Sequence, residues 1–221
     1  MMFSKVHPRS QISSLQLYRS PAFGVSRRKS ATETLRPSSL PRTPQPVGAM
    51  AAPDAVIHTP PFRVGHGWDL HRLEPGFPLI IGGIDIPHTV GCVAHSDGDV
   101  LLHTVVDAIL GALSLPDIGQ LFPDTDPKWK GASSDVFVKE AVHLLEERGY
   151  VLGNIDCTII AQKPKLSPHK EEIRSNLCKL LNADPSVVNI KAKTHEKVDS
   201  LGENRSIACH AVVMLIRSSA A

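Results

Sequence analysis

Apolar and polar residues change their spacing repeatedly from residue 62 onward, and these changes predict a mixture of strands and helices. Short apolar runs, several of them rich in β-branched residues, predict strands at 62–69, 78–86, 154–162, 187–193 and 207–216. Longer amphipathic runs predict helices at 99–113, about 134–148 and 168–181. Together they predict an α+β fold: a mixed β-sheet with helices packed on one face, in a single domain.

Polar residues before two of the apolar runs predict helix starts. Ser96 precedes Asp99 by three residues and an apolar run follows, so Ser96 is a predicted capping residue. Free amides at such a helix start favour binding of a phosphate group. Ser133 or Ser134 is predicted to cap the next helix, which Gly149 ends.

Two segments interrupt the regular pattern. Gly82-Gly83 lies inside the apolar run 78–86 and predicts a turn or bulge there. The segment 115–131 is polar and rich in Pro, Asp and Gly. Because it is longer than an ordinary connection, we predict that it is a functional loop.

The first 50 residues differ in composition from the rest of the chain. Eight Lys and Arg residues stand against one acidic residue, Glu33, so this segment has a net charge of +7. It is also rich in Ser and Pro and shows no sustained apolar period. This composition is typical of an organelle transit peptide, and a basic arm that binds nucleic acid is the alternative. We predict a disordered transit peptide at 1–55 and one folded domain at 56–221.

The charge of the remaining chain restricts its partners. The whole sequence carries +2, so the part after residue 50 carries −5, which excludes nucleic acid as an expected partner of the domain. A phosphorylated substrate therefore requires metal ions, backbone amides and a few local cations.

The four cysteines form no Cys-x-x-Cys pair and predict no disulfide framework. No apolar stretch is long enough to predict a membrane span.

One group of polar residues predicts a metal site. Asp69 and His71 are two residues apart, so on a strand their side chains leave the same face. His103 lies one turn into the predicted helix at 99–113. Asp, His and His form a three-ligand set that suits zinc with its fourth position open. The alternative is that both histidines are hydrogen-bonded core residues. Asp107 is either a hydrogen-bond partner of the His103 imidazole or a plain polar-face residue.

Six segments in order resemble the family of 2-C-methyl-D-erythritol 2,4-cyclodiphosphate synthases. The resemblance extends from about Phe62 to Ile216, nearly the whole predicted domain. The segments that carry it are 63–72, 95–103, 117–119, 122–126, 161–166 and 191–197.

This resemblance implies a phosphorus–oxygen lyase of the non-mevalonate, or methylerythritol phosphate, pathway of isoprenoid biosynthesis. In the family's reaction, the 2-phosphate of 4-diphosphocytidyl-2-C-methyl-D-erythritol 2-phosphate attacks the β-phosphorus of the same molecule. CMP leaves, and 2-C-methyl-D-erythritol 2,4-cyclodiphosphate forms. The resemblance further implies a homotrimer with active sites at the subunit interfaces and, for a plant-type member with a transit peptide, the chloroplast stroma.

The resemblance also implies roles for particular residues. Zn²⁺ is expected on Asp69, His71 and His103, and Mg²⁺ or Mn²⁺, bridging the substrate diphosphate, on Glu196. His95 and Thr194 are expected to stabilise the transition state. All six segments are expected to contribute contacts to the substrate. The expected contacts toward the methylerythritol and its phosphates are Asp69, His71, His95, Ser96, Asp117, Ile118, Gly119, Phe122, Pro123, Asp124, Thr125 and Asp126. The expected contacts toward the cytidine diphosphate are Ala161, Gln162, Lys163, Pro164, Lys165, Leu166, Ser167, Ala192, Lys193, Thr194, His195 and Glu196.

Two other functions are open at this point. A zinc-dependent phosphohydrolase or nucleotidase would use the same ligands to generate hydroxide and would yield an open product. A non-catalytic cytidine-nucleotide-binding module would show no turnover. The chain departs from the family in one stretch, since many bacterial members carry Arg near the position of Glu203, where the trimer axis binds an isoprenoid diphosphate. The resemblance therefore gives no support for an anion site on the axis here.

Overall fold

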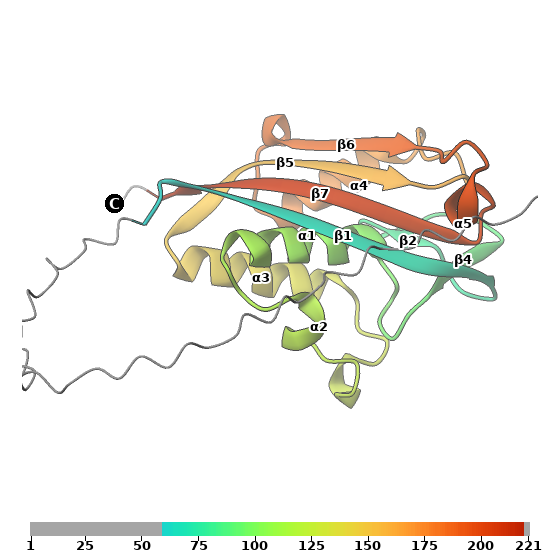
Figure 1. Ribbon diagram of the computed structural model, residues 1–221, viewed down its shortest axis with the longest axis horizontal. Coiled ribbons are helices and arrows are strands. Elements are labelled where there is room, and N and C mark those ends of the chain that lie inside the picture. The colour runs from blue at the N-terminus through green and yellow to red at the C-terminus, as the bar shows by residue number, and fades with distance from the viewer. Residues whose placement is uncertain (1–58, 219–221) are drawn as a thin grey trace, which may run out of the picture. The chain divides into compact units, whose positions relative to one another are not determined.

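The structure is a computed structural model that describes residues 59–218 (Figure 1). The predicted transit peptide at 1–55 lies outside the described residues. Five strands form one mixed sheet in the order β4-β1-β7-β5-β6, and β5 and β6 are its one parallel pair. The strands of this sheet are β1 (Phe62–Pro75), β4 (Val90–Val93), β5 (Tyr150–Ile160), β6 (Val188–Lys193) and β7 (Ser206–Arg217).

Helices cover one face of the sheet, as the α+β prediction requires. The long helix α1 (Val100–Ala112) packs against β1 and β7, α3 (Asp135–Glu147) packs against α1 and β5, and α4 (Lys170–Leu180) packs against β6 (Figure 1). Almost every side chain of α1 is buried, so this helix is the centre of the core. Cys157 and Cys209 are fully buried apolar neighbours of the core, as their apolar surroundings predicted.

Strand β1 shows why α1 can lie so close to the sheet. Its residues alternate between the exposed face and the face that α1 covers. A Cβ atom at Gly65 would lie 1.9 Å from the Ala108 carbonyl oxygen, and one at Gly67 would lie 2.0 Å from the Thr104 carbonyl oxygen. Both positions therefore require glycine, because a side chain at either one would overlap the backbone of α1.

Several predicted boundaries are wrong. The segment 78–86 is a hairpin of β2 (Ile80–Ile81) and β3 (Ile84–Asp85), because Gly82 and Gly83 both adopt positive φ. The segment 115–131 contains α2 (Ile118–Leu121) and the 3₁₀ turn η1 (Pro127–Trp129). Strand β1 continues to Pro75, six residues beyond its predicted end, because it also pairs with β4.

Three short elements complete the described chain. β4 and α5 (Asp199–Gly202) were not predicted, nor was the 3₁₀ turn η2 (Pro185–Val187), because each is too short to show a hydrophobic period. Across residues 59–218, no helix has the length and apolar character needed to cross a membrane.

Candidate metal centre and substrate pockets

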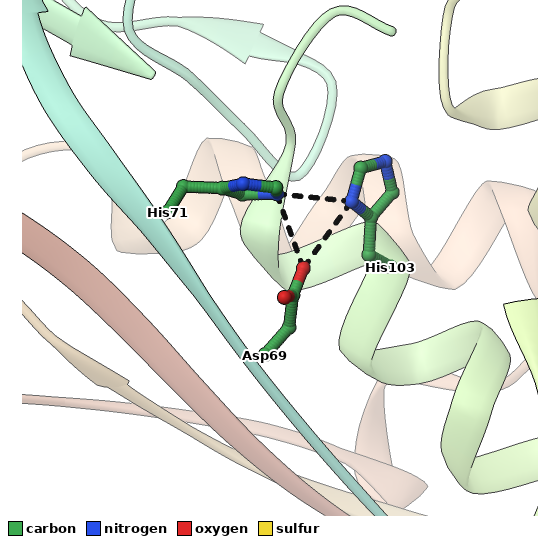
Figure 2. A group of neighbouring side chains, drawn as sticks. All are labelled: Asp69, His71 and His103. Atoms are coloured by element: carbon green, nitrogen blue, oxygen red, sulfur yellow. Dashed lines mark hydrogen bonds and ion pairs between the residues drawn. The ribbon is translucent and has the colours of Figure 1, made fainter. Parts of the chain in front are cut away.

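Asp69, His71 and His103 lie together with their polar atoms facing one another (Figure 2). Asp69 and His71 come from β1 and point toward α1, which supplies His103. Asp69 Oδ2 is 3.1 Å from His71 Nε2 and 3.3 Å from His103 Nδ1, and the two imidazole nitrogens are 3.1 Å apart. The prediction that these three residues form a group able to hold a metal ion is confirmed.

The spacing of the three atoms fits a tetrahedral ion. Zinc–nitrogen and zinc–oxygen bonds of about 2.0–2.1 Å place tetrahedral ligand atoms roughly 3.3–3.4 Å apart, close to the distances found here. Burial raises the pKa of Asp69, but hydrogen bonds and charges of His103 and His71 outweigh it and hold that pKa well below its usual range. The carboxylate is therefore available as an anionic ligand at neutral pH.

The start of α1 differs from its prediction. Asp99, not Ser96, is the N-cap: its fully buried Oδ1 accepts hydrogen bonds from Leu101 N at 3.1 Å and Leu102 N at 3.0 Å. Its carboxylate also accepts from the amides of Gly82 and Gly83, which ties the β2–β3 hairpin to the helix. Asp99 therefore occupies the Leu101 and Leu102 amides, so these two are not free to hold phosphate, and substrate contacts by His95 and Ser96 stay predictions.

The second ring nitrogen of His103 faces two hydroxyl groups. Nε2 lies 2.9 Å from Ser134 Oγ and 3.1 Å from Ser96 Oγ. Ser134 was predicted only as a helix cap, but its side chain makes no capping hydrogen bond to α3. The prediction that Asp107 supports the His103 imidazole is wrong, because its Oδ1 instead accepts from Ile118 N at 2.8 Å, at the start of α2.

A pocket of about 200 Å³ opens beside the metal ligands. Its walls include two of the ligands, several residues expected from the resemblance, and two aromatic residues that no sequence motif indicated. Phe122 lies 4.7 Å from Phe137 and 5.3 Å from Trp129 between ring centroids, so these three rings form an apolar wall. The lining residues are His71, Ala94, His95, Ser96, His103, Ile118, Gly119, Phe122, Asp124, Trp129 and Phe137.

Two acidic residues expected at this site have local structural partners. Asp117 caps α2 by accepting a hydrogen bond from Gln120 N at 2.9 Å. Asp126 accepts from Lys128 N at 3.1 Å at the start of η1. Asp117, Pro123, Thr125 and Asp126 do not line the pocket, whereas Asp124 does. Substrate contacts by these residues stay predictions, and Asp124 is the best placed of the acidic ones.

A second pocket, of about 450 Å³, lies at the ends of β5 and β6. It brings together two segments that are thirty residues apart in the sequence and that the resemblance assigned to one nucleotide site. Its lining residues are Ala161, Gln162, Lys163, Pro164, Lys165, Leu166, Ser167, Ala192, Lys193 and Thr194.

Thr194 lines this second pocket, and Glu196 is its hydrogen-bond partner two residues along the chain; neither belongs to the metal-binding group. The Thr194 hydroxyl donates a hydrogen bond of 2.6 Å to Glu196 Oε1, and both side chains are exposed. Glu196 adopts a positive φ of 50°, an uncommon backbone conformation for a non-glycine residue. Within the described chain, the metal-binding group contains Asp69, His71 and His103 without Glu196.

Strand register gives the separation of the two pockets. Leu70 and Ile160 both pair with Ala208, and Ile160 also pairs with Lys193, so the two sites are level at one end of the sheet. Three strand-to-strand steps separate β1 from β6, which at about 4.8 Å each amounts to roughly 14 Å.

Comparison with known proteins identifies the class to which this fold and site belong. The chain belongs to the YgbB family, whose model matches residues 62–216. Among its relatives is the chloroplastic 2-C-methyl-D-erythritol 2,4-cyclodiphosphate synthase of Catharanthus roseus, 73% identical over 173 residues, which cover 78% of this chain and 72% of the relative. The corresponding synthase of Lysinibacillus sphaericus is 51% identical over 71% of this chain and 99% of its own length.

Solved structures show the same relationship. The Plasmodium falciparum protein IspF, in complex with CDP, is 38% identical and aligns with a TM-score of 0.64, covering 72% of this chain and 97% of that one. A 2C-methyl-D-erythritol-2,4-cyclodiphosphate synthase in a CDP-bound form is 42% identical, with a TM-score of 0.65 over 69% of this chain and 99% of that one. The predicted fold class and the stated resemblance are confirmed.

Proposed function

We propose that this chain converts 4-diphosphocytidyl-2-C-methyl-D-erythritol 2-phosphate to 2-C-methyl-D-erythritol 2,4-cyclodiphosphate and CMP. The observation that carries the proposal is the pairing of a three-ligand metal group with a separate loop pocket built from the expected nucleotide-binding segments. Relatives that align with nearly the whole domain bear the name of this synthase, and solved relatives bind CDP.

The reaction is an intramolecular phosphoryl transfer, so the protein must supply position and charge compensation rather than a nucleophile. An oxygen of the 2-phosphate forms a bond to the β-phosphorus, and the bond from that phosphorus to the oxygen of CMP breaks. A divalent ion on Asp69, His71 and His103 supplies Lewis-acid compensation of the phosphate charge, and the mixed nitrogen and oxygen ligands favour Zn²⁺.

The chain's own residues then orient the substrate. The apolar wall of Phe122, Trp129 and Phe137 leaves room beside His95 for the methylerythritol, and Asp124 can accept hydrogen bonds from its hydroxyl groups. Backbone groups of 161–167 are fixed acceptors and donors for cytosine. Glu196, a hard oxygen ligand, is the proposed residue for Mg²⁺ or Mn²⁺ at the diphosphate.

The separation of the two pockets supports an oligomeric enzyme. Thr194 and the metal ligands must reach the same transferring phosphate, yet roughly 14 Å of sheet separates their strands within one chain. A second copy that places its β6 end against the first copy's metal pocket removes this conflict. We therefore propose a cyclic homotrimer, the assembly implied by the resemblance, with each site shared between neighbouring copies.

The uncovered face of the sheet is the proposed subunit interface. Apolar side chains of β1 and β7 project from it and are 39–68% exposed, which is unusual for a sheet face in a monomeric protein. They are Phe62, Val64, Trp68, Leu70 and Val212. The alternation of β1 places these residues opposite the metal ligands, so one strand contributes to assembly with one face and to catalysis with the other.

Plant relatives of this chain are chloroplastic. We propose that residues 1–55 are a transit peptide and that the remaining domain acts in the stroma. Cleavage near Ala55 should leave turnover unchanged, since every residue assigned above lies beyond it.

Product analysis tests the proposed reaction. The domain, loaded with Zn²⁺ and supplied with Mg²⁺, is incubated with the diphosphocytidyl substrate and followed by phosphorus NMR. Cyclic diphosphate with an equal amount of CMP is the expected result. An open-chain hydrolysis product would instead indicate the phosphohydrolase, and tight CDP binding without any product would indicate a nucleotide-binding module.

A further inference from the structure

The environment of His103 differs at its two ring nitrogens. Nδ1 faces Asp69 Oδ2 at 3.3 Å and His71 Nε2 at 3.1 Å, which is the side where a metal ion fits. Nε2 faces the opposite way, toward Ser134 Oγ at 2.9 Å. Ser134 is fully buried and begins α3, an element that contributes no metal ligand.

Asp97 determines where the Ser134 hydroxyl proton lies. Asp97 Oδ2 accepts a 2.8 Å hydrogen bond from Ser134 N, and Asp97 Oδ1 accepts a 2.5 Å hydrogen bond from Ser134 Oγ. The Ser134 hydroxyl has a single proton, and its donation to Asp97 Oδ1 points that proton away from His103. The lone pairs of Ser134 Oγ are then left for His103.

The position of Ser134 in its helix supports this reading. A serine at an N-cap ordinarily accepts a hydrogen bond from an amide in the first helical turn. Ser134 occupies the N-cap of α3 but makes no such bond, because its side chain is turned to Asp97 and His103. This helix start therefore lacks the usual side-chain capping interaction, and local helix stability does not explain the orientation.

We propose that Asp97 and Ser134 are positioning residues that hold His103 as its Nε2–H tautomer. A neutral imidazole carries one N–H, and Ser134 Oγ accepts it at Nε2, so Nδ1 keeps its lone pair for the metal. The chain of contacts runs from the Asp97 carboxylate through the Ser134 hydroxyl to Nε2–H. This inference rests on the proposed metal centre and adds two residues to it.

Ser96 provides a weaker second acceptor at the same nitrogen. Its Oγ lies 3.1 Å from Nε2, and a 3.4 Å contact with Gly98 N holds it less firmly than Asp97 holds Ser134. Loss of Ser134 should therefore weaken the metal site and not abolish it. Removal of a hydrogen-bond partner behind a metal-bound histidine typically lowers metal affinity about 10–100-fold, and that is the expected range.

Zinc affinity of the full chain tests the proposal, measured by competition with a chromophoric chelator at fixed pH. Ser134→Ala should bind Zn²⁺ about 10–100-fold more weakly than the wild type. Ser134→Thr keeps the hydroxyl and should bind within about threefold of the wild type. Ser133→Ala is the matched control, because Ser133 is the exposed neighbour and does not face His103.

Asp97→Asn is the sharper variant, since it keeps the shape of the side chain and can still accept from Ser134 N, but reverses the hydrogen bond to the Ser134 hydroxyl. An Asn amide can donate to Ser134 Oγ, which frees the hydroxyl proton to point at Nε2 and favours the Nδ1–H tautomer. Proton–nitrogen NMR of the zinc-loaded proteins observes the His103 Nε2–H directly, because the metal then occupies Nδ1 and Asp69 no longer competes for a proton there. The Nε2–H resonance of the wild type should be that of a proton hydrogen-bonded to Ser134 Oγ, and Asp97→Asn should shift this resonance and bind zinc more weakly.

The possible outcomes separate the two proposals. Wild-type zinc affinity and an unchanged His103 Nε2–H resonance in both Ser134→Ala and Asp97→Asn would overturn the positioning role. A wild-type protein that binds no zinc would instead overturn the metal centre itself. Should Ser134→Ala fail to fold, the near-isosteric Asp97→Asn variant still tests the positioning role, with Ser134→Thr as its comparison. Thermal unfolding without metal, measured for each variant and the wild type, shows that a change in zinc affinity does not come from a loss of folding.

Discussion

At the scale of single residues, the ligand most accessible to a clean test is His103, because it lies on α1 and its loss leaves the β1 pairing intact. His103→Ala should lower metal content from one ion per subunit to none after gel filtration, with a loss of affinity above about 100-fold. Elemental analysis measures the content. His143→Ala, on the exposed surface of α3, is the control. Full occupancy in His103→Ala would contradict the ligand set.

Thr194 and Glu196 should differ in their response to magnesium. Thr194→Ala removes a donor expected at the transition state and should lower kcat roughly a hundredfold, while zinc content stays unchanged. Glu196→Gln should raise the magnesium concentration needed for half-maximal rate, since excess ion compensates for a weakened ligand. Thr194→Ser retains the hydroxyl and controls for the 2.6 Å hydrogen bond between these residues. The same magnesium dependence in both alanine and glutamine variants would contradict this assignment.

The cysteines give a prediction about pH. Burial raises the pKa of Cys92 to about 12, with nearby Asp99, Asp69 and Asp97 adding to the effect, and burial raises that of Cys157 to about 12. Neither thiol should react with a disulfide reagent at pH 8 in the native protein, and both should react in guanidinium. The unfolded thiols ionise near pH 9, whereas the pKa of each buried thiol is about 12. Between pH 9 and 12 ionisation therefore favours the unfolded chain, and the free energy of unfolding should fall as pH rises through this range. Mass spectrometry locates the labelled residues, and rapid native labelling of Cys92 would contradict its burial.

Sequence predicts the residues of the metal group better than the residues behind it. Asp69 and His71 were predictable because strand geometry alone places side chains two apart on one face. Ser134 was not, because its contact with His103 spans 31 residues and depends on how α3 packs against α1. Its only sequence signal, a serine before a helix, predicts a capping role that the structure does not show.

At the scale of elements, the packing of α1 on β1 sets the distance between the metal ligands. Gly67→Ala would place a Cβ 2.0 Å from the Thr104 carbonyl oxygen, one residue from His103. The helix must then move away from the strand, and we expect a loss of about 1–3 kcal/mol in folding stability together with weaker zinc binding. Denaturant unfolding with and without Zn²⁺ measures both.

Gly111→Ala is the matched control on the same helix. The nearest atom to its added Cβ is the His66 carbonyl oxygen at 3.8 Å, an ordinary contact, and the position is exposed. Alanine in a helix is favoured over glycine by about 0.8–1 kcal/mol, so this variant should be slightly more stable than the wild type with unchanged zinc affinity. Equal destabilisation by Gly67→Ala and Gly111→Ala would contradict the close approach of α1 to Gly67 as the cause of the loss.

Long elements were predictable, while short ones were not. The apolar runs that became β1, β5, β7 and α1 are long enough to show a period. The hairpin of β2 and β3 was hidden within one apolar run, because the turn at Gly82-Gly83 and the Asp99 carboxylate, not the side-chain pattern, determine its shape. The segment 115–131 was correctly singled out as more than a connector, but its two short helices depend on caps by Asp117 and Asp126.

At the scale of the whole molecule, the sheet presents a functional problem that a single chain does not solve. Its metal-binding group and the pocket lined by 161–167 and 192–194 are level at one end, yet three strand spacings apart. Its uncovered face carries large apolar side chains. Both features support the proposed cyclic assembly, in which the exposed faces would meet and neighbouring copies would complete each other's sites.

Mixing two strongly impaired variants tests whether sites are shared. His103→Ala lacks the metal half of the site and Thr194→Ala lacks the phosphate-contacting half. In a trimer assembled at random from equal amounts, each shared site needs its metal half from a Thr194→Ala copy and its other half from a His103→Ala copy. Roughly a quarter of the sites meet both conditions, so about a quarter of wild-type activity should return on co-refolding. Separate refolding followed by mixing, without exchange of subunits, is the control. If each chain formed a complete site by itself, no activity above that of the parent variants would return, and the shared-site assembly would be excluded.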